Sequence, residues 1–140
     1  MPEEEFEFPS VEGVIVLHAS VIGKHPDEAP ANVMNMGLLE SAVNRPRQRF
    51  FYESADLPAL AATLLWGVVN NHPFYDGNKR TAWVTTEYFL YQNGYILPPG
   101  GESIRLVLNI ALGRRSVEEV EEWIRHRLEP AQQRRWFFNE

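Results

Sequence analysis

Residues 57–93 read LPALAATLLWGVVNNHPFYDGNKRTAWVTTEYFLYQN and carry the clearest helical pattern in the chain. In the first part, apolar residues recur at the i, i+3, i+4 spacing of one buried face, which predicts a helix over residues 57–71. The last part, residues 79–93, is apolar on nearly all sides, so we expect it to be the central buried helix. A polar loop separates the two helices.

Similar patterns predict four further helices, near residues 10–22, 36–43, 102–112 and 116–128. Ser116 and Glu119 form a capping box at the start of the last one. Pro46 should end the second, with an irregular loop up to Asp56. No segment shows the alternation of a strand. The sequence therefore predicts an all-α, single-domain bundle of about six helices over residues 10–130, with loose ends at residues 1–9 and 131–140.

Composition narrows the function. The 140 residues suffice for one domain, and 44% of them are hydrophobic. A net charge of -6 argues against direct nucleic-acid binding. The absence of cysteine excludes disulfides and thiolate metal sites. The beginning, MPEEEFEFP, has no signal-peptide pattern and no stretch approaches a membrane span, so we expect a cytoplasmic protein without a membrane partner.

The loop between the two best helices, residues 72–80, reads HPFYDGNKR and has two interpretations. In the first it is an ordinary turn, in which Asp76 or Asn78 caps the next helix and Gly77 adopts a positive φ. In the second it binds an anion. Cations at positions 79 and 80 are disfavoured by the macrodipole at a helix N-terminus, by roughly 0.3–1 kcal/mol each, so a negative ligand is expected there.

Two side chains extend the second interpretation to catalysis. Asp76 offers the hard oxygen ligand that suits Mg²⁺ shared with nucleotide phosphates. His72 offers an imidazole, which changes its charge near neutral pH and serves as a general base. Together with the anion site, these residues indicate phosphate chemistry.

The motif HPFYDGNKRTA, residues 72–82, resembles the signature of the Fic/Doc family, and Lys79 before Arg80 resembles its death-on-curing (Doc) branch. The segment GLLESAVNRP, residues 37–46, resembles a second segment of that branch. The Asn93–Tyr95 corner and residues 111–124 resemble it as well. The resemblance covers about residues 14–128.

The resemblance implies a role for each loop residue. His72 would accept the proton of the attacking hydroxyl, Asp76 would hold Mg²⁺, and Phe74 would be the buried anchor of the loop. The phosphates of ATP would be bound by residues around the start of the next helix, namely Gly77, Asn78, Lys79 and Arg80.

The resemblance also implies a function: a Doc-like toxin of a type II toxin–antitoxin system. It would transfer a phosphoryl group from ATP to a Ser or Thr hydroxyl of a cytoplasmic protein. By analogy with the family, this target could be a translation factor such as elongation factor Tu. Two alternatives stay open. One is AMP transfer to a protein hydroxyl, as in Fic proteins, and the other is a catalytically weak module that binds an antitoxin.

The sequence departs from the family pattern in three respects. Trp83, which we expect in the core, stands where AMP-transferring Fic proteins carry a second arginine. Residues 33–36 (VMNM) replace the Arg and Asp of many Doc relatives. The internal inhibitory motif of self-restrained Fic proteins is missing, so we expect an antitoxin that inhibits in trans. Homo-oligomerisation stays open, as does docking of the tail QQRRWFFNE. His18, on an apolar stripe, is expected to be a partly buried histidine with its hydrogen bonds satisfied, and not a ligand.

Overall fold

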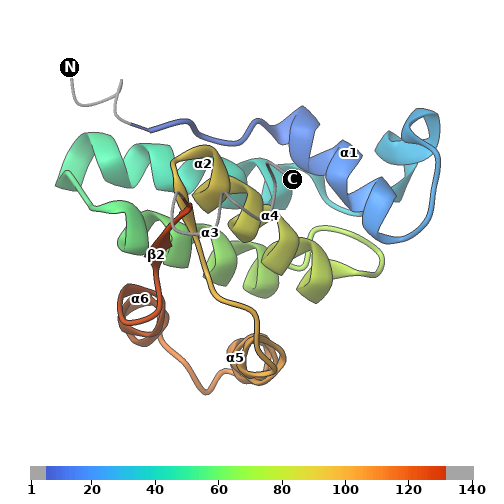
Figure 1. Ribbon diagram of the computed structural model, residues 1–140. Coiled ribbons are helices and arrows are strands. Elements are labelled where there is room, and N and C mark those ends of the chain that lie inside the picture. Colours follow the sequence, from blue (N-terminus) through green and yellow to red (C-terminus); the bar gives the residue numbers. More distant parts are fainter. Residues whose placement is uncertain (1–5, 132–140) are drawn as a thin grey trace, which may run out of the picture.

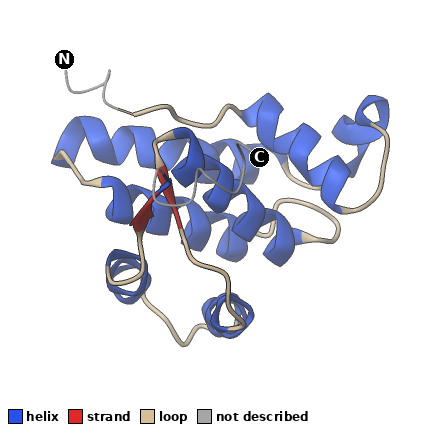
Figure 2. Cartoon of the chain, viewed as in Figure 1, coloured by secondary structure: helices blue, strands red, loops and turns tan. Residues whose placement is uncertain are grey.

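The computed structural model describes residues 6–131. Within them the chain forms six α-helices, one 3₁₀ helix and a two-stranded sheet (Figure 2). In chain order the elements are α1 (Val11–Val21), η2 (Pro26–Asn32), α2 (Met36–Glu53), α3 (Leu57–Asn71), α4 (Asn78–Gln92), β1 (Tyr95–Ile96), α5 (Glu102–Ala111), α6 (Val117–Arg125) and β2 (Glu129–Pro130). The predicted all-α bundle of about six helices is confirmed.

Helix α3 is the centre of the bundle and packs against α2, α4, α5 and α6 (Figure 1). Eleven of its fifteen residues are buried, and several are alanine or glycine, which lets neighbouring helices approach from several sides. The expectation that residues 79–93 form the central helix was wrong. Tyr88 and Tyr91 in α4 are each more than half exposed, because a tyrosine counts as apolar in a pattern yet keeps a hydroxyl for water.

Helix α2 continues through Pro46 to Glu53, so the irregular loop predicted after position 46 was wrong. Proline removes one helical hydrogen bond, but Pro46 and Phe50 are both buried. Phe50 packs edge-to-face on Phe6 at 5.2 Å between ring centroids. Arg49 donates to the Thr63 hydroxyl of α3 at 2.8 Å. These tertiary contacts outweigh the local cost of proline.

Residues 6–9 were expected to be loose, and the structure corrects this expectation. Phe6 and Phe8 pack against the large core, and Phe8 stacks on Phe89 of α4 at 5.8 Å. The Asn93 side chain accepts from the backbone N–H of Glu7 and donates to its carbonyl, at 2.8 and 3.0 Å. The remainder of the expected loose ends, residues 1–5 and 132–140, lies outside the described residues.

Local signals set several element ends. Ser116 and Glu119 form the predicted capping box. Asp56 caps α3 and also accepts from Arg125 of α6, and this bonding holds the pKa of Asp56 below its ordinary value. Strand β1 pairs antiparallel with β2, which joins the chain after α4 to the end of α6. Each strand has only two residues, too few for an alternating pattern.

Two cores result. The larger surrounds α3, and the smaller lies between α1, η2 and α2, with Phe74 of the loop as its largest member. The smaller core therefore joins the first half of the bundle to the loop between α3 and α4. Within residues 6–131 we find no helix with the length and hydrophobicity needed to cross a membrane.

Candidate active site

His72 ends α3 in the left-handed region, with φ 48° and ψ 56°. Its backbone N–H donates to the carbonyl of Val68 at 3.2 Å, and its side chain is exposed. Only Ser54 shares a positive φ among the non-glycine residues of the described chain. Backbone of this kind is costly for most residues and clusters at functional sites. The fold thus presents this imidazole to solvent at a backbone turn.

A reciprocal bridge between Asn78 and Phe74 closes the loop. The Asn78 Oδ1 accepts from the Phe74 N–H, and its Nδ2 donates to the Phe74 carbonyl, both at 2.9 Å. Both residues are buried. The bridge occupies the side chain of Asn78, whereas its backbone N–H, in the first turn of α4, has no intrahelical acceptor and can bind an anion.

The segment before α2 braces the loop from outside. The backbone N–H groups of Met34 and Asn35 donate to the carbonyl of Pro73 at 2.8 and 3.1 Å. The N–H of Tyr75 donates to the carbonyl of Asn32 at 3.4 Å. Met34 and Asn35, which belong to the uncharged segment 33–36, thus support the loop through their backbone.

The N-terminus of α4 is open. Gly77 is the N-cap with φ 71°, and within residues 6–131 no side chain caps this helix, so the caps expected of an ordinary turn are absent. The first intrahelical bond is donated by the N–H of Thr81 to the carbonyl of Gly77. Lys79 and Arg80 are exposed and form no ion pair within the described chain. Free N–H groups, a positive dipole end and two unpaired cations together favour an anion.

This helix end opens into a groove of about 650 Å³, a volume typical of small-molecule sites. Five consecutive residues, 76–80, supply most of its polar lining, together with Ser103. Its apolar side comes from α1, α4 and α5: Val21, Ile22, Trp83, Ile104, Val107 and Leu108. His72 and Phe74 are not among its lining residues. The groove therefore brings together five of the seven predicted site residues, with His72 exposed at the end of α3 and Phe74 buried beneath the loop.

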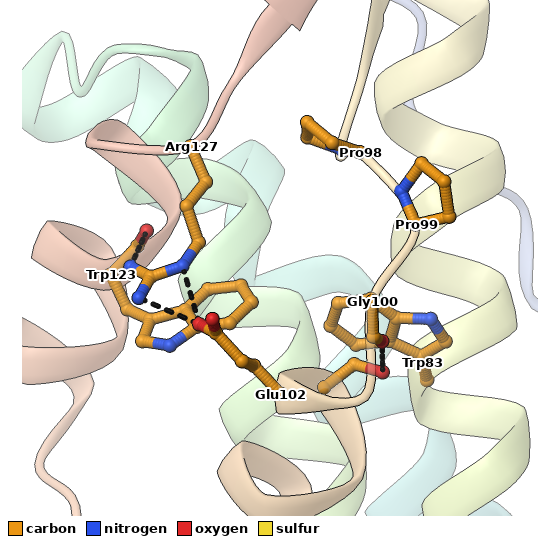
Figure 3. A pocket seen from close by; sticks show the side chains of 8 residues that line it. Trp83, Pro98, Pro99, Gly100, Glu102, Trp123 and Arg127 are labelled. Atoms are coloured by element: carbon orange, nitrogen blue, oxygen red, sulfur yellow. Dashed lines mark hydrogen bonds and ion pairs between the residues drawn. The ribbon is translucent and has the colours of Figure 1, made fainter.

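Trp83 lines this groove and also a smaller cavity of about 180 Å³, which Figure 3 shows. It packs edge-to-face on Trp123 at 6.2 Å between ring centroids. In that cavity, Arg127 lies over the Trp123 ring at 4.2 Å and pairs with Glu102 at 2.9 Å, so its charge is already neutralised. Trp83 is half-buried and packs against the large core, but it also forms a wall of the groove.

The donor set suits Mg²⁺ only in company with a nucleotide. Within residues 6–131 there is no cluster of three or more side chains that could hold a metal by themselves. Asp76 supplies one exposed carboxylate beside the anion site. Mg²⁺ is commonly bound by one or two carboxylates together with substrate phosphates and water, and the loop fits this arrangement.

Sequence reasoning underestimated three residues at the site. His18 was expected to be partly buried, but it is fully buried and hydrogen-bonds the loop. Its signal was a polar residue on an apolar stripe. Ile104 and Leu108 are 76% and 47% exposed, and their signal was a surplus of apolar residues in α5 over what one buried face requires.

Comparisons with known proteins place the chain among relatives of one family. The model of the Fic/DOC family matches residues 8–90. Toxin Doc of Mycolicibacterium smegmatis is 45% identical over 65 residues, which are 44% of this chain and 49% of that protein. Protein kinase doc of Escherichia phage P1 is 32% identical over 117 residues, which are 83% of this chain and 91% of that protein. The match thus spans about half of the first relative and most of the second.

The Asn78–Phe74 bridge predicts a stability effect. Asn78→Ala leaves the buried N–H and carbonyl of Phe74 without partners, and should lower the free energy of unfolding by about 3 kcal/mol in urea denaturation. Asn70→Ala is the matched control, because the Asn70 amide donates to the Trp66 carbonyl at an exposed position. It should change stability by less than about 0.5 kcal/mol. Equal stabilities of the two variants would show that the bridge contributes nothing.

Proposed function

The chain belongs to the Fic/Doc family and is a Fic/Doc-type transferase, and we propose that it transfers the γ-phosphoryl group of ATP to a Ser or Thr hydroxyl of a protein. The observation that carries this proposal is the open N-terminus of α4, where Lys79 and Arg80 lie beside Asp76 and form no ion pair with any of residues 6–131. Such a site neutralises phosphate charge. The name of the relative protein kinase doc, which matches 83% of the chain, supports the phosphoryl group as the one transferred.

In the proposed reaction, His72 accepts the proton of the target hydroxyl while the oxygen of that hydroxyl forms a bond to the γ-phosphorus. The bond from that phosphorus to the bridging oxygen breaks, and ADP leaves. The N–H groups at the start of α4, with Lys79 and Arg80, stabilise the charge on the phosphate oxygens. Mg²⁺, held by Asp76, would neutralise further phosphate charge.

The polarity of the groove supports this orientation of ATP. Residues 76–80 supply the N-terminal N–H groups and the two cations of the lining, and Trp83, Ile104 and Leu108 supply apolar side chains. In the proposed orientation, the base contacts the apolar side chains and the phosphate chain lies at residues 76–80. Trp83 cannot neutralise phosphate, as an arginine at this position would. The geometry therefore favours presentation of the γ-phosphorus over the α-phosphorus.

We further propose that the protein acts in the cytoplasm as the toxin of a toxin–antitoxin pair. The name of the relative Toxin Doc supports this role. By analogy with the family, we propose a translation factor such as elongation factor Tu as the target. An antitoxin would place an amphipathic segment in the groove, with apolar side chains on Ile104 and Leu108 and acidic ones at Lys79 and Arg80. Nucleotide and antitoxin would then compete for one groove.

Replacement of the proposed base tests catalysis separately from folding. His72→Ala should lower the transfer rate roughly 10²- to 10⁴-fold. His72→Asn, which suits a left-handed backbone better, should be equally inactive while the melting temperature stays near that of the wild type. His126→Ala, at an exposed histidine outside the groove, is the control and should keep full activity. An active His72→Asn enzyme would remove His72 from the role of base.

The identity of the transferred group follows from parallel reactions with ATP labelled at the α or the γ phosphate. A cell lysate and purified elongation factor Tu serve as targets. The γ label should appear on a target Ser or Thr, with a mass gain of one phosphoryl group. Label from the α position would establish AMP transfer instead. Absence of label from both would favour the catalytically weak antitoxin-binding module.

Co-expression with the neighbouring gene tests the antitoxin. We expect its product to co-purify with this chain and to suppress its toxicity. Ile104→Asp should abolish co-purification, because it puts a charge on the apolar side of the groove. Leu112→Asp is the control, since Leu112 is 53% exposed but does not line the groove. Unchanged binding by Ile104→Asp would place the partner elsewhere.

A further inference from the structure

We propose that His18 is a positioning residue, which fixes the peptide group between Asp76 and Gly77 so that the Gly77 N–H faces the groove as an anion donor. This inference concerns a residue of α1, outside the predicted site. Its consequence for transfer rests on the function proposed above, whereas its consequence for the loop backbone does not.

The side chain of His18 contacts the loop in two ways. The ring is fully buried, and its Nε2 lies 2.8 Å from the carbonyl oxygen of Asp76. It also stacks on the ring of Phe74, with 3.7 Å between centroids and 5° between planes. One side chain thus contacts both the buried anchor of the loop and the backbone next to the anion site.

The hydrogen bond identifies the tautomer of His18. A carbonyl oxygen only accepts, so Nε2 carries the proton and donates it. The other nitrogen, Nδ1, is buried without a partner in the described part of the chain. An unpaired buried nitrogen is unfavourable, and a phenylalanine would stack on Phe74 without it. What histidine provides here, and phenylalanine could not, is the donor to the Asp76 carbonyl.

That donor controls the direction of a neighbouring N–H. In a planar trans peptide, the carbonyl of one residue and the N–H of the next point in opposite directions. Because the Asp76 carbonyl is held towards the buried His18, the Gly77 N–H points away from it, and Gly77 lines the groove. A rotated peptide would instead place the carbonyl oxygen, a partial negative charge, against a phosphate.

The backbone conformation and the surroundings of position 77 also restrict which residue can stand there. Its φ of 71° is unfavourable for other residues, and a Cβ at this position would lie 2.7 Å from the Ile22 Cγ2. Glycine is thus required for the turn, but glycine alone permits many backbone orientations. The His18 bond selects one of them, as preorganised donors at an anion site require.

Two substitutions separate the ring from the donor. His18→Phe keeps the stacking on Phe74 and removes the hydrogen bond. His18→Gln keeps an Nε2 donor and removes the ring. We expect His18→Phe to melt at or above the wild-type temperature, yet to bind Mg·ATP and inorganic pyrophosphate more weakly, by on the order of tenfold or more. His18→Gln should retain more of the affinity while melting lower.

The amide signal of Gly77 in ¹⁵N NMR spectra gives a readout that needs no enzyme activity. It should shift or split in His18→Phe, as the peptide samples a second orientation, and return towards the wild-type position in His18→Gln. An unchanged Gly77 signal in His18→Phe, or affinities that simply follow the melting temperatures of both variants, would overturn the proposal. A changed signal in a protein that transfers no group would leave the positioning role intact and refute the proposed function.

Discussion

The backbone of a five-residue loop, residues 74–78, is the constraint on which the site depends. The Asn78–Phe74 bridge closes it from within. Phe74 anchors it in the smaller core, and the peptides of residues 32–35 brace its outer side. A β-turn is defined by at most one backbone hydrogen bond, so this loop has more fixed contacts than a turn alone requires. These contacts have a purpose where a backbone must hold its N–H groups in one direction before a ligand binds.

The same arrangement explains why two cations stand at the unfavourable end of a helix. Lys79 and Arg80 oppose the macrodipole of α4, and no acidic side chain of residues 6–131 compensates them. Without a ligand, the interaction of these cations with the helix dipole is unfavourable. A bound polyphosphate would make the local electrostatic energy favourable, because its negative charge interacts with both the cations and the dipole. The apolar side of the groove adds contact area without competing for this charge.

Features of the fold and the site that depend on residues close together in sequence were predictable, and those that depend on distant contacts were not. Helix α3 has the predicted bounds, because Pro58 stands in its first turn and apolar residues repeat along its whole length. The end of α2 was mispredicted, since Pro46 is a local stop signal whereas the burial of Phe50 depends on Phe6, far away in sequence. The loop residues were recognisable from their motif. The contribution of His18 was not, because its partner Asp76 lies 58 positions away.

Helix α1 connects these features. Its C-terminal region carries His18 beneath the loop, and Val21 and Ile22 in the wall of the groove. α1 also packs against α4, whose N-terminus is the proposed anion site. An occupant of the groove that contacts Val21 or Ile22 therefore touches the same helix that holds the Asp76 carbonyl. A partner segment bound there would exclude the nucleotide by occupying its space, and it need not distort the loop to do so. Because the loop is fixed by its own contacts, release of such a partner would leave the anion site ready to bind.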